Sequence, residues 1–211
     1  MDAWSTFEQA LDTNGPRRVE LLMQAEEELN GDDSVAACDR DVLLCCIASV
    51  GVGERFASVE EVIDPAREVA SRCRSSWPLY HLAESAHAIG AHQQVLNALS
   101  EVGAGFFESC DLMWRSARCA ELRAVAMTNL MCHPSEIETV VSEIAASYVE
   151  YGEQHDFAPP RDLVTALIDP RISLRGCLEI LQRSLDLEMW LGPDVAVLVE
   201  RALQRGPISD G

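Results

Sequence analysis

The segment Leu82-Ala-Glu-Ser-Ala-His-Ala-Ile-Gly90 is the most informative about the fold, because a similar segment occurs further along the chain. At an offset of 37 residues it aligns with Cys119-Ala-Glu-Leu-Arg-Ala-Val-Ala-Met127. The same offset aligns residues 64–73 with residues 101–110. Apolar residues recur in these segments at spacings of three and four, which is the period of one helix face. The sequence therefore predicts a unit of two helices that occurs more than once.

The helical period continues through nearly the whole chain, whereas no segment alternates apolar and polar residues as a half-buried strand does. We predict an all-α protein of about ten or eleven helices without significant sheet. A repeat of about 20–50 residues in a helical chain is typical of stacked antiparallel helix pairs. Three pairs and a looser fourth are expected at residues 39–75, 77–109, 111–153 and 160–188.

Local signals predict where the helices begin and end. Serine caps exposed N–H groups, proline fits a first turn because its missing N–H is not needed there, and glycine ends helices. The expected capping serines are Ser34, Ser58 and Ser135. The expected first-turn prolines are Pro16, Pro65, Pro78 and Pro193, and the expected terminators are Gly15, Gly31, Gly152 and Gly206.

Small residues are expected where the two helices of a pair cross: Ala83 and Ala86 face Val95, Leu99 and Val102. This alternation of small and large apolar positions is similar to the tetratricopeptide pattern. Over residues 39–153 the chain thus resembles the tetratricopeptide-like and HEAT-like α-solenoids. The resemblance implies stacked helix pairs whose first helices line a concave, protein-binding surface.

The chain also departs from the tetratricopeptide pattern. The unit length differs, Phe107 stands where a proline normally closes the unit, and Arg123 stands where the second unit has Ala86. A non-repeating helical bundle therefore stays an alternative to the solenoid.

One domain is expected, because one continuous core can organise 211 residues. We predict a single all-helical domain at residues 1–205. It consists of N-terminal helices at 1–33, the three helix pairs at 39–153, and C-terminal helices with a cap at 160–205. Residues 206–211 are expected to form a flexible tail.

The charge balance excludes several classes of partner. The net charge of −19 comes from 35 acidic residues against 16 arginines, with no lysine. Such a surface repels nucleic-acid phosphates and anionic lipids, so neither nucleic acid nor membrane is an expected partner. Because the N-terminus lacks a signal-peptide pattern and the longest uncharged apolar run, residues 42–53, is too short to cross a bilayer, we predict a cytoplasmic protein.

The eight cysteines mostly fall at apolar helix positions, which indicates reduced core thiols. No spacing places two ligands one or two residues apart in a loop, as zinc sites usually require, and Cys132-His133 is the nearest approach. No metal and no cofactor are expected.

Catalytic motifs are also missing from the sequence. The glycine pairs Gly51/Gly53 and Gly103/Gly105 lack the third glycine of a dinucleotide loop, and neither a nucleophile elbow nor a phosphate-binding loop occurs. We therefore predict that the protein is not an enzyme.

Five polar residues lie on the first helices of the second and third expected pairs. Residues three apart on a helix can touch, as His81 and Glu84 or Arg118 and Glu121 would. We predict that this set contacts a partner on a concave surface, although exposed ion pairs on a solvated face would show the same pattern. The predicted contacts are His81, Glu84, Arg115, Arg118 and Glu121.

The predicted function is a non-enzymatic protein–protein interaction module, of the adaptor, regulatory or inhibitor and immunity type. It would hold a protein or peptide on an acidic concave helical surface, and complementary charge favours a basic partner. One alternative is a small helical enzyme or small-molecule-binding bundle with a pocket between helices. Another is a structural homodimer or larger oligomer that covers the apolar last helix, residues 195–203.

Overall fold

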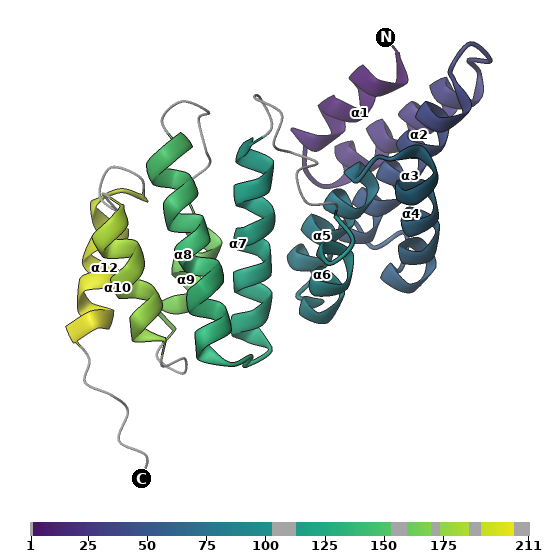
Figure 1. The fold of residues 1–211 in the computed structure, drawn as a ribbon. Helices are drawn as coiled ribbons and strands as arrows, with labels where there is room; N and C mark the ends of the chain where they lie inside the picture. The colour runs from purple at the N-terminus through teal and green to yellow at the C-terminus, as the bar shows by residue number, and fades with distance from the viewer. Residues whose placement is uncertain (1, 103–112, 153–159, 170–173, 186–190, 205–211) are drawn as a thin grey trace. The chain divides into compact units, whose positions relative to one another are not determined.

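The computed structural model describes residues 2–102, 113–152, 160–169, 174–185 and 191–204. These residues form eleven α-helices and no strand, which confirms the all-α prediction and the expected number of helices (Figure 1). The helices are α1 (Ala3–Leu11), α2 (Pro16–Asn30), α3 (Ala37–Gly53), α4 (Val59–Cys73), α5 (Trp77–Ala88), α6 (His92–Leu99), α7 (Met113–Asn129), α8 (Pro134–Tyr151), α9 (Arg161–Leu167), α10 (Arg175–Ser184) and α12 (Pro193–Gln204).

The helices belong to two compact units, residues 1–106 and residues 107–211. The sequence predicts a single domain at residues 1–205, and that assignment stays a prediction. None of the described helices is both long enough and apolar enough to span a membrane.

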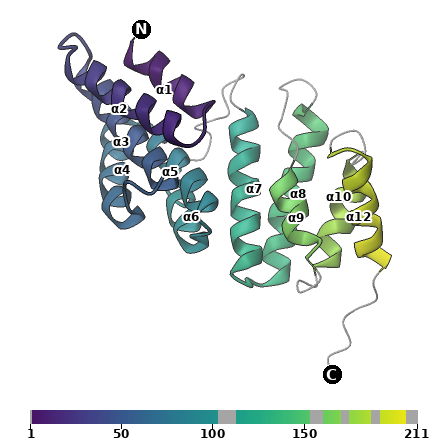
Figure 2. The same ribbon diagram turned by 180° about the vertical axis from the view of Figure 1, so that it is seen from behind.

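In the first unit, helices that follow one another in sequence pack together. Helix α1 packs on α2, α3 packs on α4 and α5, and α5 packs on α6 (Figure 2). The core of α1, α2 and α3 contains the fully buried Phe7, Leu22, Leu29 and Leu43. The predicted pairs at residues 39–75 and 77–109 therefore contain helices that pack on each other.

The second unit shows the same order. Helix α7 packs on α8 and on α9, while α10 packs on α8, α9 and α12. Its fully buried side chains include Leu122, Ile137, Ile144, Leu163 and Leu181. Neighbouring helices thus pack as the sequence predicts.

Helices α3, α5 and α7, which are the first helices of the three predicted pairs, end in the same type of turn. The residue in the left-handed conformation is Arg55 after α3 (φ 65°), Gly90 after α5 (φ 75°) and Met131 after α7 (φ 56°). In each case the next N–H bonds back to a carbonyl in the last turn, at 3.2, 2.8 and 3.0 Å respectively, which is the Schellman motif. These ends align Gly90 with Met131, whereas the sequence offset of 37 aligns Gly90 with Met127. A difference of four residues is about one helical turn, so the same face stays aligned.

Several local signals proved correct. Ser58 caps α4 in a capping box with Glu61, and Pro16, Pro78 and Pro193 lie in first turns. Gly31 and Gly152 are the C-terminal capping residues of α2 and α8.

Other local signals were wrong. The caps of α3 and α8 are Ala36 and His133, because Ser34 bonds to the Asp32 side chain and Ser135 lies one residue inside its helix. Gly15 begins α2 rather than ending α1.

Pro65 lies in the interior of α4 rather than in its first turn. A proline there lacks the N–H that would bond to the preceding turn, so this helix forms despite its sequence. The predicted equivalence of residues 64–73 with 101–110, the terminator Gly206 and the tail at 206–211 fall largely outside the described residues.

The expectation of reduced cysteines is wrong for one pair. Cys38 at the start of α3 and Cys73 at the end of α4 form a disulfide, with their Cα atoms 5.4 Å apart. Because α4 runs back along α3, residues 35 apart in sequence meet at the open end of the hairpin. Cys45, Cys46, Cys132 and Cys177 are free cysteines in the described ranges.

Candidate functional site

The predicted contact residues divide between the two units: His81 and Glu84 lie on α5, and Arg115, Arg118 and Glu121 lie on α7. Their surroundings show which of them present a side chain to solvent.

His81 is buried rather than exposed on a solvated face. Its ring lies among aromatic rings, with centroids 5.4 Å from Phe7, 5.8 Å from Trp77 and 5.4 Å from Tyr80. Glu84 is half-buried and accepts a hydrogen bond from the Tyr80 hydroxyl at 2.9 Å. His81 is therefore part of an aromatic cluster that joins α1 to α5.

Glu121 is buried more deeply, with only 2% of its surface exposed. Its Oε1 accepts hydrogen bonds from the backbone N–H groups of Asp162 and Leu163, at 3.1 and 3.2 Å, at the start of α9. Its Oε2 accepts from Arg118 at 2.6 Å, and the same Arg118 nitrogen lies 2.8 Å from Asp162 Oδ2. Because the residue before α9 is Pro160, which has no capping side chain, Glu121 caps this helix from α7.

Burial raises the pKa of Glu121, and the nearby Arg118 charge only partly opposes this effect. Burial also raises the pKa of Tyr148 on α8, with a further increase from the negative charge of Glu121. A buried carboxylate with a raised pKa is a frequent sign of an active site. Here both oxygens of Glu121 already hold hydrogen bonds within the chain, so this cluster is a structural brace across α7 and α9.

Arg115 lies one turn before Arg118. Its guanidinium carbon is 3.7 Å from the centroid of the Trp114 ring, a cation–π contact. Arg115 and Arg118 are both half-buried.

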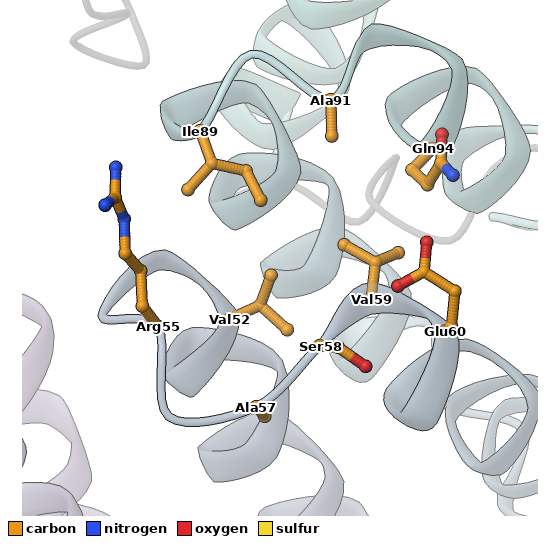
Figure 3. A pocket seen from close by; sticks show the side chains of 9 residues that line it. All are labelled: Val52, Arg55, Ala57, Ser58, Val59, Glu60, Ile89, Ala91 and Gln94. Atoms are coloured by element: carbon orange, nitrogen blue, oxygen red, sulfur yellow. The ribbon is translucent and has the colours of Figure 1, made fainter.

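A pocket that the sequence did not predict lies in the first unit, between the α3–α4 turn and the α5–α6 turn (Figure 3). We call it the turn pocket. Its volume is about 300 Å³. It is lined by Val52, Arg55, Ala57, Ser58, Val59, Glu60, Ile89, Ala91 and Gln94.

The turn pocket has an apolar floor and charged rims. Val52 and Val59 are buried, whereas Ile89 is 41% exposed. Arg55 and Glu60 are exposed and stand on opposite sides of the pocket in Figure 3. In the described part of the chain neither of them forms an ion pair, although the neighbouring Glu54 pairs with Arg18 at 3.0 Å.

The turn between α3 and α4 carries a further exposed apolar residue, which does not line the pocket. Phe56 is 49% exposed and follows Arg55 in the turn. A Cβ atom at Gly51 would overlap the Phe56 ring, so the ring lies directly on the α3 backbone. The equivalent turn after α7 also exposes apolar residues, Leu130 and Met131.

Sequence reasoning missed the turn pocket for an identifiable reason. Arg55 and Ile89 are 34 residues apart, and only the packing of α3 on α5 brings their turns together. The one signal available was an apolar residue at each helix end.

Among the described residues, no group of three or more histidine, cysteine, aspartate or glutamate side chains could hold a metal ion. No protein-family model, curated protein sequence or solved structure matches this chain.

Proposed function

We propose that this protein is a protein–protein interaction module and that the turn pocket, together with Phe56, is its binding surface. The observation that carries the proposal is an apolar floor beside the exposed Ile89, with two rim charges, Arg55 and Glu60, that form no ion pair among the described residues. Phe56 adds an exposed apolar side chain in the same turn as Arg55. A surface of this kind is typical of partner recognition, because large apolar side chains are stabilised by contact rather than by water.

The arrangement of helices supports the same class of function. Helix pairs that pack on one another in sequence order are compatible with a tetratricopeptide-like solenoid, which remains part of the proposal. The predicted partner contacts are the second element of the proposal, and each group belongs to its own unit: His81 and Glu84 on α5, and Arg115, Arg118 and Glu121 on α7. Since His81 and Glu121 are buried, Glu84, Arg115 and Arg118 are the members that a partner would reach first.

A basic partner is favoured by the net charge of −19. A cytoplasmic location also belongs to the proposal, but the Cys38–Cys73 disulfide argues against it, because disulfides persist mainly in oxidising compartments. Alkylation of thiols in intact cells before lysis distinguishes the cytoplasm from an oxidising compartment. A disulfide-linked Cys38–Cys73 peptide would contradict a cytoplasmic protein.

Affinity purification with the full chain tests the proposed surface. The variant Phe56→Ser/Ile89→Ser removes both exposed apolar side chains, and Met23→Ser/Val149→Ser is a matched control at exposed apolar residues outside the pocket. Circular dichroism confirms that each variant is folded. We expect a stoichiometric partner with the wild type and the control but not with the pocket variant.

Two results would count against this function. A partner retained by Phe56→Ser/Ile89→Ser would exclude the turn pocket as the surface. The absence of any stoichiometric partner of the wild-type chain would contradict the interaction module itself.

A further inference from the structure

We propose that the turn pocket of one copy binds the exposed face of α12 from a second copy. This inference goes beyond the proposed function, because it needs no foreign partner and is tested on the purified protein alone.

One face of α12 combines apolar and charged side chains. Val197 and Leu198 are 43% and 42% exposed. Asp194 lies three and four residues before them, and Arg201 lies four and three residues after them, so the four side chains share one face of the helix. All four are exposed, and neither charge forms an ion pair in the described part of the chain.

The two charges of α12 also stabilise the helix itself. Asp194 in the first turn and Arg201 in the last turn interact favourably with the helix dipole. That effect does not account for Val197 and Leu198 between them, which face solvent although Val199 on the same helix is buried. Because they are adjacent, Val197 and Leu198 form a small apolar patch that is suited to a contact.

The turn pocket has the complementary pattern. An apolar floor formed by Val52 and Val59 lies between Arg55 on one rim and Glu60 on the opposite rim. Leu198 would enter the pocket beside Ile89. At about 300 Å³ the pocket is at the small end of ligand pockets, which suits one or two aliphatic side chains better than a large ligand.

The charges fix the direction of α12 in the pocket. Asp194 would pair with Arg55, and Arg201 would pair with Glu60. The reverse direction would bring two cations together at one rim and two carboxylates at the other, and like charges in contact oppose association. Each copy carries one pocket and one α12, so the contact joins unlike surfaces. Two copies exchange both contacts, or further copies add in a row.

Sedimentation equilibrium of the full chain measures this association over a range of protein concentration. Leu198→Ser should weaken it about tenfold, which corresponds to about 1.4 kcal/mol, and Glu60→Arg should weaken it by a smaller factor. Glu26→Arg is the control for the charge change in Glu60→Arg, and Arg74→Glu is the control for the charge change in Arg201→Glu. Glu26 and Arg74 are both exposed. The controls should associate like the wild type.

A charge exchange gives the sharpest test. The double variant Glu60→Arg/Arg201→Glu places opposite charges together again, and it should recover the association that Glu60→Arg loses. Recovery is not expected if Glu60→Arg merely disturbs folding. A chain that is monomeric at all concentrations, or a double variant that associates no better than Glu60→Arg, would overturn the proposal.

Discussion

Met131 has a left-handed backbone conformation (φ 56°) at the end of α7, and its side chain is 74% exposed. A side chain in this conformation costs about 1 kcal/mol or more, and glycine avoids that cost. We expect Met131→Gly to raise the free energy of unfolding by about 0.5–1 kcal/mol in urea titrations, because little buried surface is lost. Leu130→Gly, one residue earlier, is the control and should destabilise the helix end. A loss of stability in Met131→Gly would contradict the role of the Schellman turn.

Glu121 is buried and accepts three hydrogen bonds, from Arg118 and from two backbone N–H groups of α9. Replacing it by alanine leaves two backbone N–H groups of α9 without their acceptor. It also removes one of the two carboxylates that Arg118 contacts, while Asp162 remains. We expect Glu121→Ala to lower the free energy of unfolding by about 2–4 kcal/mol, because each buried N–H group left without an acceptor costs about 1–3 kcal/mol. Glu121→Gln keeps an oxygen for the N–H groups and should lose less. Equal losses in the two variants would show that the cap of α9 contributes nothing.

The raised pKa of Glu121 also predicts a pH dependence. The folded chain binds a proton at Glu121 more readily than the unfolded chain does, whose pKa is near the ordinary value of 4.5. The stability gained from protonation is therefore complete below that value and is lost as pH rises through the higher pKa of the folded state. Relative to Glu121→Gln, which does not titrate, the wild type should become more stable as pH falls from neutral toward 4.5. An opposite slope would mean that Arg118 dominates over burial.

At the scale of the helices, the disulfide closes the first long hairpin. Cys38 and Cys73 join the beginning of α3 to the end of α4, and the α3–α4 turn joins their other ends. A cross-link over 35 residues is expected to stabilise the fold by about 3–4 kcal/mol, mainly through the unfolded chain. Reduction by dithiothreitol should lower the free energy of unfolding by this amount, and the urea midpoint should fall accordingly. Cys38→Ser should show the lower midpoint with or without reductant, whereas Cys45→Ser should behave like the wild type. A thiol count that is the same with and without reductant would contradict the bridge.

The sequence predicts elements better than contacts. Helices and their pairing follow from apolar spacing and from first-turn prolines such as Pro16, because these signals are local. The ends of α3 and α7 were not predictable in the same way, since Arg55 and Met131 occupy positions where glycine is the usual signal.

The candidate sites show the same limit. Arg118 and Glu121 are three residues apart, and their contact was predicted from that spacing. Asp162, which completes the brace, lies more than forty residues further along the chain and has no signal in the sequence. The turn pocket likewise depends on two turns that only tertiary packing brings together.

At the scale of the whole molecule, the net charge of −19 affects every association. Two copies repel each other at long range, whereas a basic partner is attracted. Added salt shortens the range of both effects, from about 30 Å at 0.01 M to about 8 Å at 0.15 M. The two kinds of association should therefore respond to salt in opposite directions.

Sedimentation and binding kinetics over this salt range test that difference. Self-association through α12 should strengthen as salt screens the repulsion, since the two exposed charge pairs at the pocket contribute only about 0.2–1 kcal/mol each. The association rate of a basic partner should instead fall steeply with salt, because long-range attraction accelerates encounter. Self-association that weakens with salt would mean that the Arg55 and Glu60 pairs outweigh the net charge. A partner whose association rate is independent of salt would mean that apolar contact at Phe56 and Ile89, rather than charge, selects it.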